Sequence, residues 1–168
     1  MRYFKIYSVV LFVCLGSFAK AQTTNHQVYA LFIVNIAKYS LWPVHTGDMQ
    51  ITVYGKTKVY DELLKQNGKS VNGVVKVNQI DDLASLGTPN IIYLADGKSS
   101  SLDELLKAVE GKSVMIITER EGLFKKGAGF SFVILENNTL RFDINNSDLE
   151  KRQIKVSKNL AALANSSL

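Results

Sequence analysis

The chain has 168 residues, carries 20 basic and 15 acidic side chains, and contains one cysteine. The sequence shows no low-complexity segment, internal repeat or long linker. Its length is ample for one hydrophobic core but too short for two ordinary domains, so we expect a single domain.

The N-terminal segment has the order of a secretory signal peptide. Two basic residues precede an apolar run over residues 6–18, and the small-x-small pattern Ala19-Lys20-Ala21 follows it. The apolar run has 13 residues, fewer than the ~20 that a membrane-spanning helix needs. We therefore expect cleavage after Ala21 instead of an uncleaved anchor, which leaves an exported domain over residues 22–168.

Removing residues 1–21 changes the charge of the domain that remains. The segment holds Arg2, Lys5 and Lys20 and no acid, so 17 basic and 15 acidic side chains are left, a net charge of +2. The strong positive charge expected of a nucleic-acid-binding protein is therefore missing. Cys14 is removed as well, so the exported domain can have neither disulfides nor thiol chemistry.

Short apolar strands alternate with helices along the exported domain. Residues 26–43 have the broad apolar face of a largely buried helix, which Pro43 stops. Further on, the patterns predict strands at 49–55, 73–80, 90–95 and 113–119 and helical segments at 58–68, 81–87 and 99–111. The alternation predicts the α/β class, a single domain with a mixed sheet covered by helices on both faces.

The stretch "GFSFVILENNTLRFDIN", residues 129–145, predicts a C-terminal β-hairpin. Apolar residues alternate along both arms, and Asn137-Asn138 lies between them as a tight turn. The preceding Gly127-Ala128-Gly129 leads into a strand and not into a helix, so it is better explained by a close backbone approach than by phosphate binding. The tail has the pattern of two short helices, with a strand-like stretch at 154–156 and Ser157 as a cap for the second.

Residues that could carry catalysis are scarce. His26 and His45 stand without acidic or cysteine neighbours at ligand spacing, which argues against a metal site. No serine lies in a Gly-x-Ser-x-Gly turn. The paired acids at 61–62, 81–82 and 103–104 lie at expected helix starts, where they complement the helix dipole. We therefore predict a protein that is not an enzyme and needs no cofactor.

Glu119 and Arg120 follow a buried strand of the expected parallel sheet. Ligands of α/β sheets bind in crevices beyond the carboxyl ends of such strands. Two interpretations remain open: these side chains line a ligand crevice, or they belong to a solvated loop.

Three segments together resemble the YfiR/HmsC-like family of periplasmic proteins. They are "YALFIVNIAKYSLWP" at 29–43, "VMIITEREGLFKKGAGFSFVILENNTLRFDIN" at 114–145 and "IKVSKNLAALA" at 154–164. The resemblance covers essentially the whole exported domain. It implies a non-enzymatic periplasmic regulator that binds the periplasmic sensor domain of an inner-membrane diguanylate cyclase and represses it, which lowers cyclic di-GMP and limits biofilm formation.

The resemblance leaves other points open. The same domain occurs beside sensor histidine kinases, so the alternative is a small-molecule sensor that acts on such a kinase. Studied members are dimers, which implies a possible homodimer here. Some members carry structural disulfides, and the absence of cysteine from residues 22–168 excludes redox switching of that kind.

The hairpin provides the expected docking face. Leu140, Phe142 and Ile144 share the parity assigned to the core, so Arg141 and Asp143 are expected to point outward. They could form an exposed ion pair of little energetic value. Alternatively, they belong to a polar rim around an apolar anchor. The hypothesised partner-binding residues are Phe130, Arg141, Asp143, Asn145 and Leu149.

Overall fold

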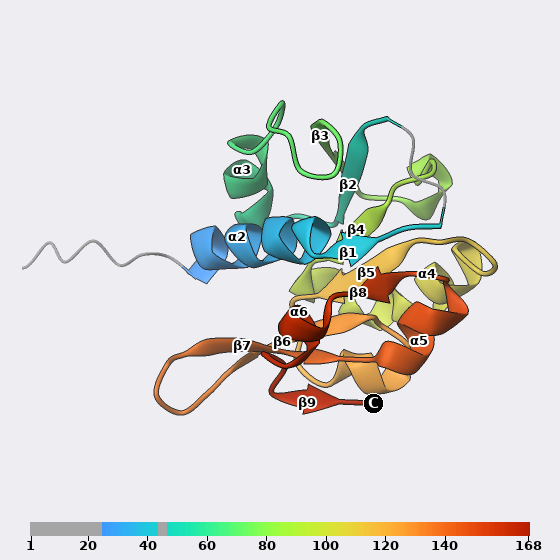
Figure 1. Cartoon of the computed structure of the whole chain (residues 1–168). Helices are drawn as coiled ribbons and strands as arrows, with labels where there is room; N and C mark the ends of the chain where they lie inside the picture. The colour runs from blue at the N-terminus through green and yellow to red at the C-terminus, as the bar shows by residue number, and fades with distance from the viewer. Residues whose placement is uncertain (1–24, 44–46) are drawn as a thin grey trace, which may run out of the picture.

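The computed structural model describes residues 25–43 and 47–168, so the expected signal peptide lies outside the described residues. Seven strands form the main sheet, in the order β3-β2-β4-β5-β6-β7-β9 (Figure 1). Their bounds are β2 (Met49–Tyr54), β3 (Val75–Ile80), β4 (Ile91–Leu94), β5 (Met115–Thr118), β6 (Phe130–Ile134), β7 (Leu140–Ile144) and β9 (Ser166–Ser167). The first five strands in chain order run parallel, and β7 lies antiparallel to β6, so the sheet is mixed as the sequence predicts.

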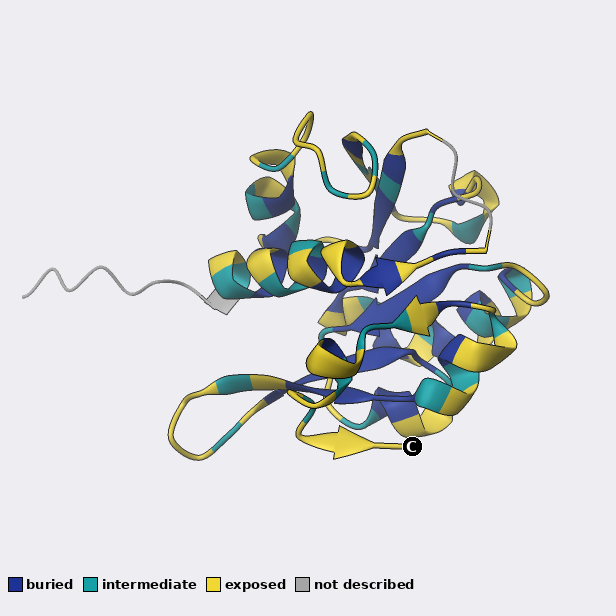
Figure 2. Ribbon diagram, in the orientation of Figure 1, coloured by how far each residue is buried: buried dark blue, intermediate teal, exposed yellow. Residues whose placement is uncertain are grey.

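Helices cover both faces of this sheet, which confirms the α/β class. One face packs against α2 (Asn25–Lys38), α3 (Val59–Leu64), α5 (Asn146–Lys151) and α6 (Lys158–Ala161). The other packs against α4 (Leu102–Ala108) and the 3-10 segments η2 (Leu83–Ser85) and η4 (Leu123–Lys126). A further 3-10 segment, η3 (Asp96–Ser101), precedes α4. Every residue of β4 and β5 is buried, as expected of central parallel strands (Figure 2).

The first helix ends earlier than its apolar pattern predicts. Residues 26–43 were expected to be helical, but α2 stops at Lys38 and Ser40–Leu41 form the short strand β1. This strand pairs antiparallel with β8 (Lys155–Val156), and the Ser157 N–H donates to the Tyr39 carbonyl. The tail thus supplies backbone hydrogen-bond partners to residues 39–41, which pair as a strand and do not continue the helix. Trp42 then turns into the main core with 9% of its surface exposed.

The hairpin and the tail agree with most of the sequence predictions. Strands β6 and β7 pair from Phe130↔Ile144 to Ile134↔Leu140, and Asn138 has a left-handed φ of 59° in the connecting loop. In the tail, β8 lies between α5 and α6, and the Ser157 hydroxyl caps α6 by accepting from the Leu160 N–H. The terminal strand β9, which runs parallel to β7, was not expected.

Candidate functional site

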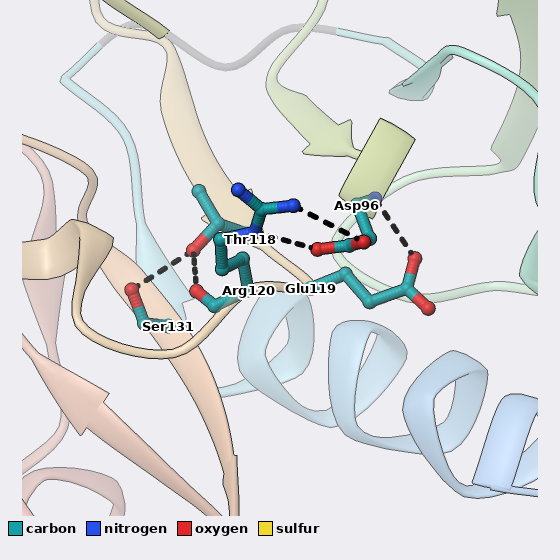
Figure 3. Close-up of polar contacts among 5 residues, drawn as sticks. All are labelled: Asp96, Thr118, Glu119, Arg120 and Ser131. Atoms are coloured by element: carbon teal, nitrogen blue, oxygen red, sulfur yellow. Dashed lines mark hydrogen bonds and ion pairs between the residues drawn. The ribbon is translucent and has the colours of Figure 1, made fainter. Parts of the chain in front are cut away.

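A polar cluster lies at the carboxyl ends of β4 and β5 (Figure 3). Glu119 directly follows β5, and its N–H donates to the Leu94 carbonyl at the end of β4. The Glu119 carboxylate accepts a hydrogen bond of 3.2 Å from the backbone N–H of Asp96. Arg120 donates to both carboxylate oxygens of Asp96, at 2.8 and 3.3 Å. The sequence prediction that Glu119 and Arg120 lie at the carboxyl edge of the sheet agrees with this geometry, whereas ligand binding there stays a prediction.

Arg120 and Asp96 form an ion pair in which each charge is balanced by the other. The hydrogen bond from Arg120 lowers the pKa of the Asp96 carboxyl below its ordinary value, and Asp96 in turn raises the pKa of Arg120. Both side chains are 54% exposed, so water screens the pair and its contribution to stability is small. The guanidinium is therefore occupied, and Glu119 faces no cation of its own among the described ion pairs.

Glu119 acts electrostatically on two tyrosines, Tyr29 of α2 and Tyr93 of β4. Tyr93 of β4 pairs in register with Ile117 of β5, so Glu119, two residues further along, lies on the same face of the sheet. Burial, and next the Glu119 charge, raise the pKa of the fully buried Tyr93 hydroxyl. The same two causes raise the pKa of Tyr29. The Tyr93 hydroxyl faces the carboxylate but makes no hydrogen bond of ordinary geometry within the described residues.

Two neighbouring hydroxyls are held in structural hydrogen bonds. Thr118 Oγ1 lies 2.8 Å from Ser131 Oγ and 3.0 Å from the Arg120 carbonyl. Ser131 Oγ also accepts from the Phe124 N–H at 2.7 Å. Both side chains are buried between β5, β6 and η4. Their role in this geometry is to fix the loop that carries Glu119 and Arg120.

Four of the five residues of the predicted docking face are buried in this structure, so the outward orientation expected of Asp143 is wrong, whereas partner binding stays a prediction. Arg141 is exposed, but Phe130, Asp143, Asn145 and Leu149 are 0%, 4%, 8% and 1% exposed. Strand β7 has neighbours on both faces at its carboxyl end, so the expected alternation of inward and outward side chains stops at Asp143. A partner cannot reach these four side chains in this conformation.

The buried polar residues of that set stabilise the tail instead. Asn145 accepts from the Asp148 N–H at the start of α5 and donates to the Phe124 carbonyl at 2.7 Å. The Asp143 carboxylate accepts from the side-chain amide of Asn165 at 2.9 Å. Phe130 and Leu149 belong to the main core.

A groove between α2 and α6 is a site that the sequence analysis missed. It has a volume of about 410 Å³ and is lined by Phe32, Asn35, Ile36, Tyr39, Phe142, Asn159, Leu160 and Leu163. Tyr39 is 47% and Leu163 56% exposed. The helical pattern of residues 29–43 indicated an apolar face but not that part of it stays uncovered, because the covering segment lies about 120 residues further along the chain.

The described residues contain neither a metal-ligand cluster nor a membrane-spanning helix. Within these ranges, His, Cys, Asp and Glu side chains do not gather in any group of three or more that could hold a metal ion. None of the helices over 25–43 and 47–168 combines the length and apolar character that crossing a bilayer requires. His45 lies outside the described residues.

Comparison with known proteins identifies the family of this chain. The family model described as YfiR/HmsC-like matches residues 26–165, from the second residue of α2 to beyond α6. The chain belongs to the YfiR/HmsC-like family. Members of this YfiR/HmsC-like family are periplasmic, regulatory and non-enzymatic, and the family is associated with cyclic di-GMP signalling and with regulatory protein interactions.

A solved structure shares the fold of this YfiR/HmsC-like domain. It is the ABC domain from Streptococcus pneumonia in complex with L-Trp, which is 9% identical in sequence and superposes with a TM-score of 0.56. The match covers 80% of this chain but only 59% of that chain. At this identity the likeness concerns the α/β fold alone.

Proposed function

We propose that this protein is a periplasmic regulator that binds the periplasmic sensor domain of an inner-membrane diguanylate cyclase and represses it. The observation that carries the proposal is the family match over residues 26–165, which leaves out only the ends of the described fold. Repression lowers cyclic di-GMP and limits biofilm formation. Cleavage of residues 1–21 delivers the domain to the periplasm, and N-terminal sequencing of protein from that compartment tests this step.

The regulatory role is tested in the native host. Deleting the gene is expected to raise cyclic di-GMP, and expressing the chain again is expected to lower it. Tagged protein added to membranes should co-purify with a cyclase that has a periplasmic domain, and deleting that cyclase should abolish the effect of the chain. Unchanged cyclic di-GMP in all these strains would refute the proposal. Sedimentation of the purified protein tests whether it acts as a homodimer.

A sensor role is the second candidate. The observation in its favour is the polar cluster of Glu119, Arg120 and Asp96 at the carboxyl edge of the sheet, next to the buried Tyr93 hydroxyl. In this alternative a small molecule binds near Glu119 and Arg120 and the domain acts on a sensor histidine kinase. Ligand-induced thermal shifts that disappear in Glu119→Gln, together with a change in kinase output, distinguish it from the cyclase proposal.

A further inference from the structure

The groove between α2 and α6 has the composition of a protein-binding surface. Phe32, Asn35 and Ile36 on α2 and Tyr39, directly after its last residue, follow the i, i+3, i+4, i+7 spacing of one helical stripe. The opposite wall is formed by Asn159, Leu160 and Leu163. The floor includes Phe142, whose ring lies 6.1 Å from that of Phe32 in an edge-on contact.

The walls of this groove remain partly exposed. Tyr39 on one wall and Leu163 on the other expose about half of their surfaces, 47% and 56%. The Asn35 and Asn159 amides are exposed and make no side-chain hydrogen bond within the described residues. An apolar floor with exposed aromatic and aliphatic edges and a few amides is the arrangement found at the centre of protein interfaces.

Two lysines are the chain neighbours of residues that line the groove. Lys38 is the last residue of α2 and precedes Tyr39, with its Nζ 5.3 Å from the centre of the Tyr39 ring, and Lys158 precedes Asn159 on α6. Both are exposed, and neither makes an ion pair with a described residue. Residues 1–24 and 44–46 contain no Asp or Glu that could neutralise them.

Charge and shape together indicate the occupant. We propose that the groove binds an amphipathic segment of the partner protein, whose apolar side chains fill the groove and whose acidic side chains face Lys38 and Lys158. A concave apolar groove fits the ridge of a helix better than it fits a flat lipid surface. This inference rests on the proposed function, because it names the part of the regulator that the partner contacts.

Two synthetic peptides test the chemistry of the occupant. Both have about 16 residues, roughly four helical turns, with leucine at i, i+3, i+4 and i+7. One carries glutamate on its polar face and its twin carries lysine. Fluorescence anisotropy with the purified protein should show at least about tenfold tighter binding of the acidic peptide, because like charges across an interface cost several kcal/mol.

Substitutions in and beside the groove test whether the peptides bind there. The double variant Lys38→Glu/Lys158→Glu should remove or reverse the preference for the acidic peptide, and Leu163→Asp should weaken both peptides. Matched controls are Lys56→Glu/Lys76→Glu, two exposed lysines elsewhere, and Ile134→Asp, which is 45% exposed on the hairpin. The controls should bind like the wild type, and circular dichroism checks that every variant is folded.

The outcomes separate this proposal from the proposed function. If the wild type captures the cyclase from membranes but the groove variants capture it equally well, the docking site lies elsewhere and only this inference fails. Equal binding of the two peptides also overturns it. The inference is also overturned if the purified protein binds only phosphatidylglycerol vesicles, or only a second copy of itself, in a way that depends on Lys38 and Lys158. If the wild type captures no membrane partner, the proposed function itself fails.

Discussion

The carboxylate of Asp143 accepts a 2.9 Å hydrogen bond from the side-chain amide of Asn165, which lies 22 residues further along the chain. Asp143 is 4% exposed, whereas Arg141, on the same parity of the same strand, is exposed. The contact holds the tail after α6 against β7, where the Asn165 N–H also donates to the Phe142 carbonyl. A residue expected on a docking surface therefore stabilises the C-terminal segment.

Asp143→Ala should destabilise the protein by about 1.5–3 kcal/mol, the range for losing a hydrogen bond to a charged group. Arg141→Ala is the matched control on the same strand, and its effect should stay within about 0.5 kcal/mol because exposed substitutions rarely do more. Urea unfolding followed by circular dichroism measures both. Equal effects of the two substitutions would mean that the Asp143–Asn165 contact contributes nothing.

Trp42→Ala should cost about 3–5 kcal/mol, as expected for truncating a buried aromatic side chain. Trp42 is 9% exposed within the main core, whereas the adjacent Leu41 is 65% exposed and provides the control. Leu41→Ala should leave the melting temperature nearly unchanged. Because Trp42 is the only tryptophan, unfolding should be followed by circular dichroism instead of tryptophan fluorescence.

Gly129→Ala should destabilise by about 1–3 kcal/mol through overpacking. A Cβ at this position would lie 2.9 Å from Leu149 Cδ2 and 3.4 Å from the Ile116 carbonyl oxygen. In the double variant Gly129→Ala/Leu149→Ala, the total loss should be smaller than the sum of the single losses, because the clash is removed. Gly97→Ala, where a Cβ meets nothing within 4 Å, should be tolerated. Strict additivity would show that Leu149 is not the obstacle.

The Asp96–Arg120 pair should make a small contribution to stability that depends on pH. Because Arg120 lowers the pKa of Asp96 in the folded protein, this contribution is present above the unfolded pKa of about 3.9 and is lost as the pH falls through the folded pKa. The difference in stability between the wild type and Asp96→Asn should therefore shrink in acid. Unfolding curves at neutral and acidic pH measure it, and a difference that grows in acid would contradict the assignment.

The amino-acid pattern predicted most helices and strands of the domain, but not β1, β9 or the end of α2. Fully apolar runs such as residues 91–94 are stable only inside a sheet covered on both faces. Alternation along 130–134 and 140–144 predicted the two arms of the hairpin, and the structure gives their register, with Phe132 opposite Phe142. The positions of Glu119 and Arg120 at the end of a buried strand also followed from pattern alone, because strand polarity fixes where the next loop lies.

Tertiary structure decided which polar and apolar residues stay exposed. Asp143 and Asn145 are buried because η4, α5 and the chain end cover the second face of β7, and no local pattern reports such distant neighbours. Helix α2 ends at Lys38 because β8 offers β1 a partner from the tail. The groove beside α2 arises because α6 covers only part of an apolar stripe. Each of these features depends on contacts between segments far apart in the chain. The free energy of those contacts outweighs the helix or strand propensity of the local sequence.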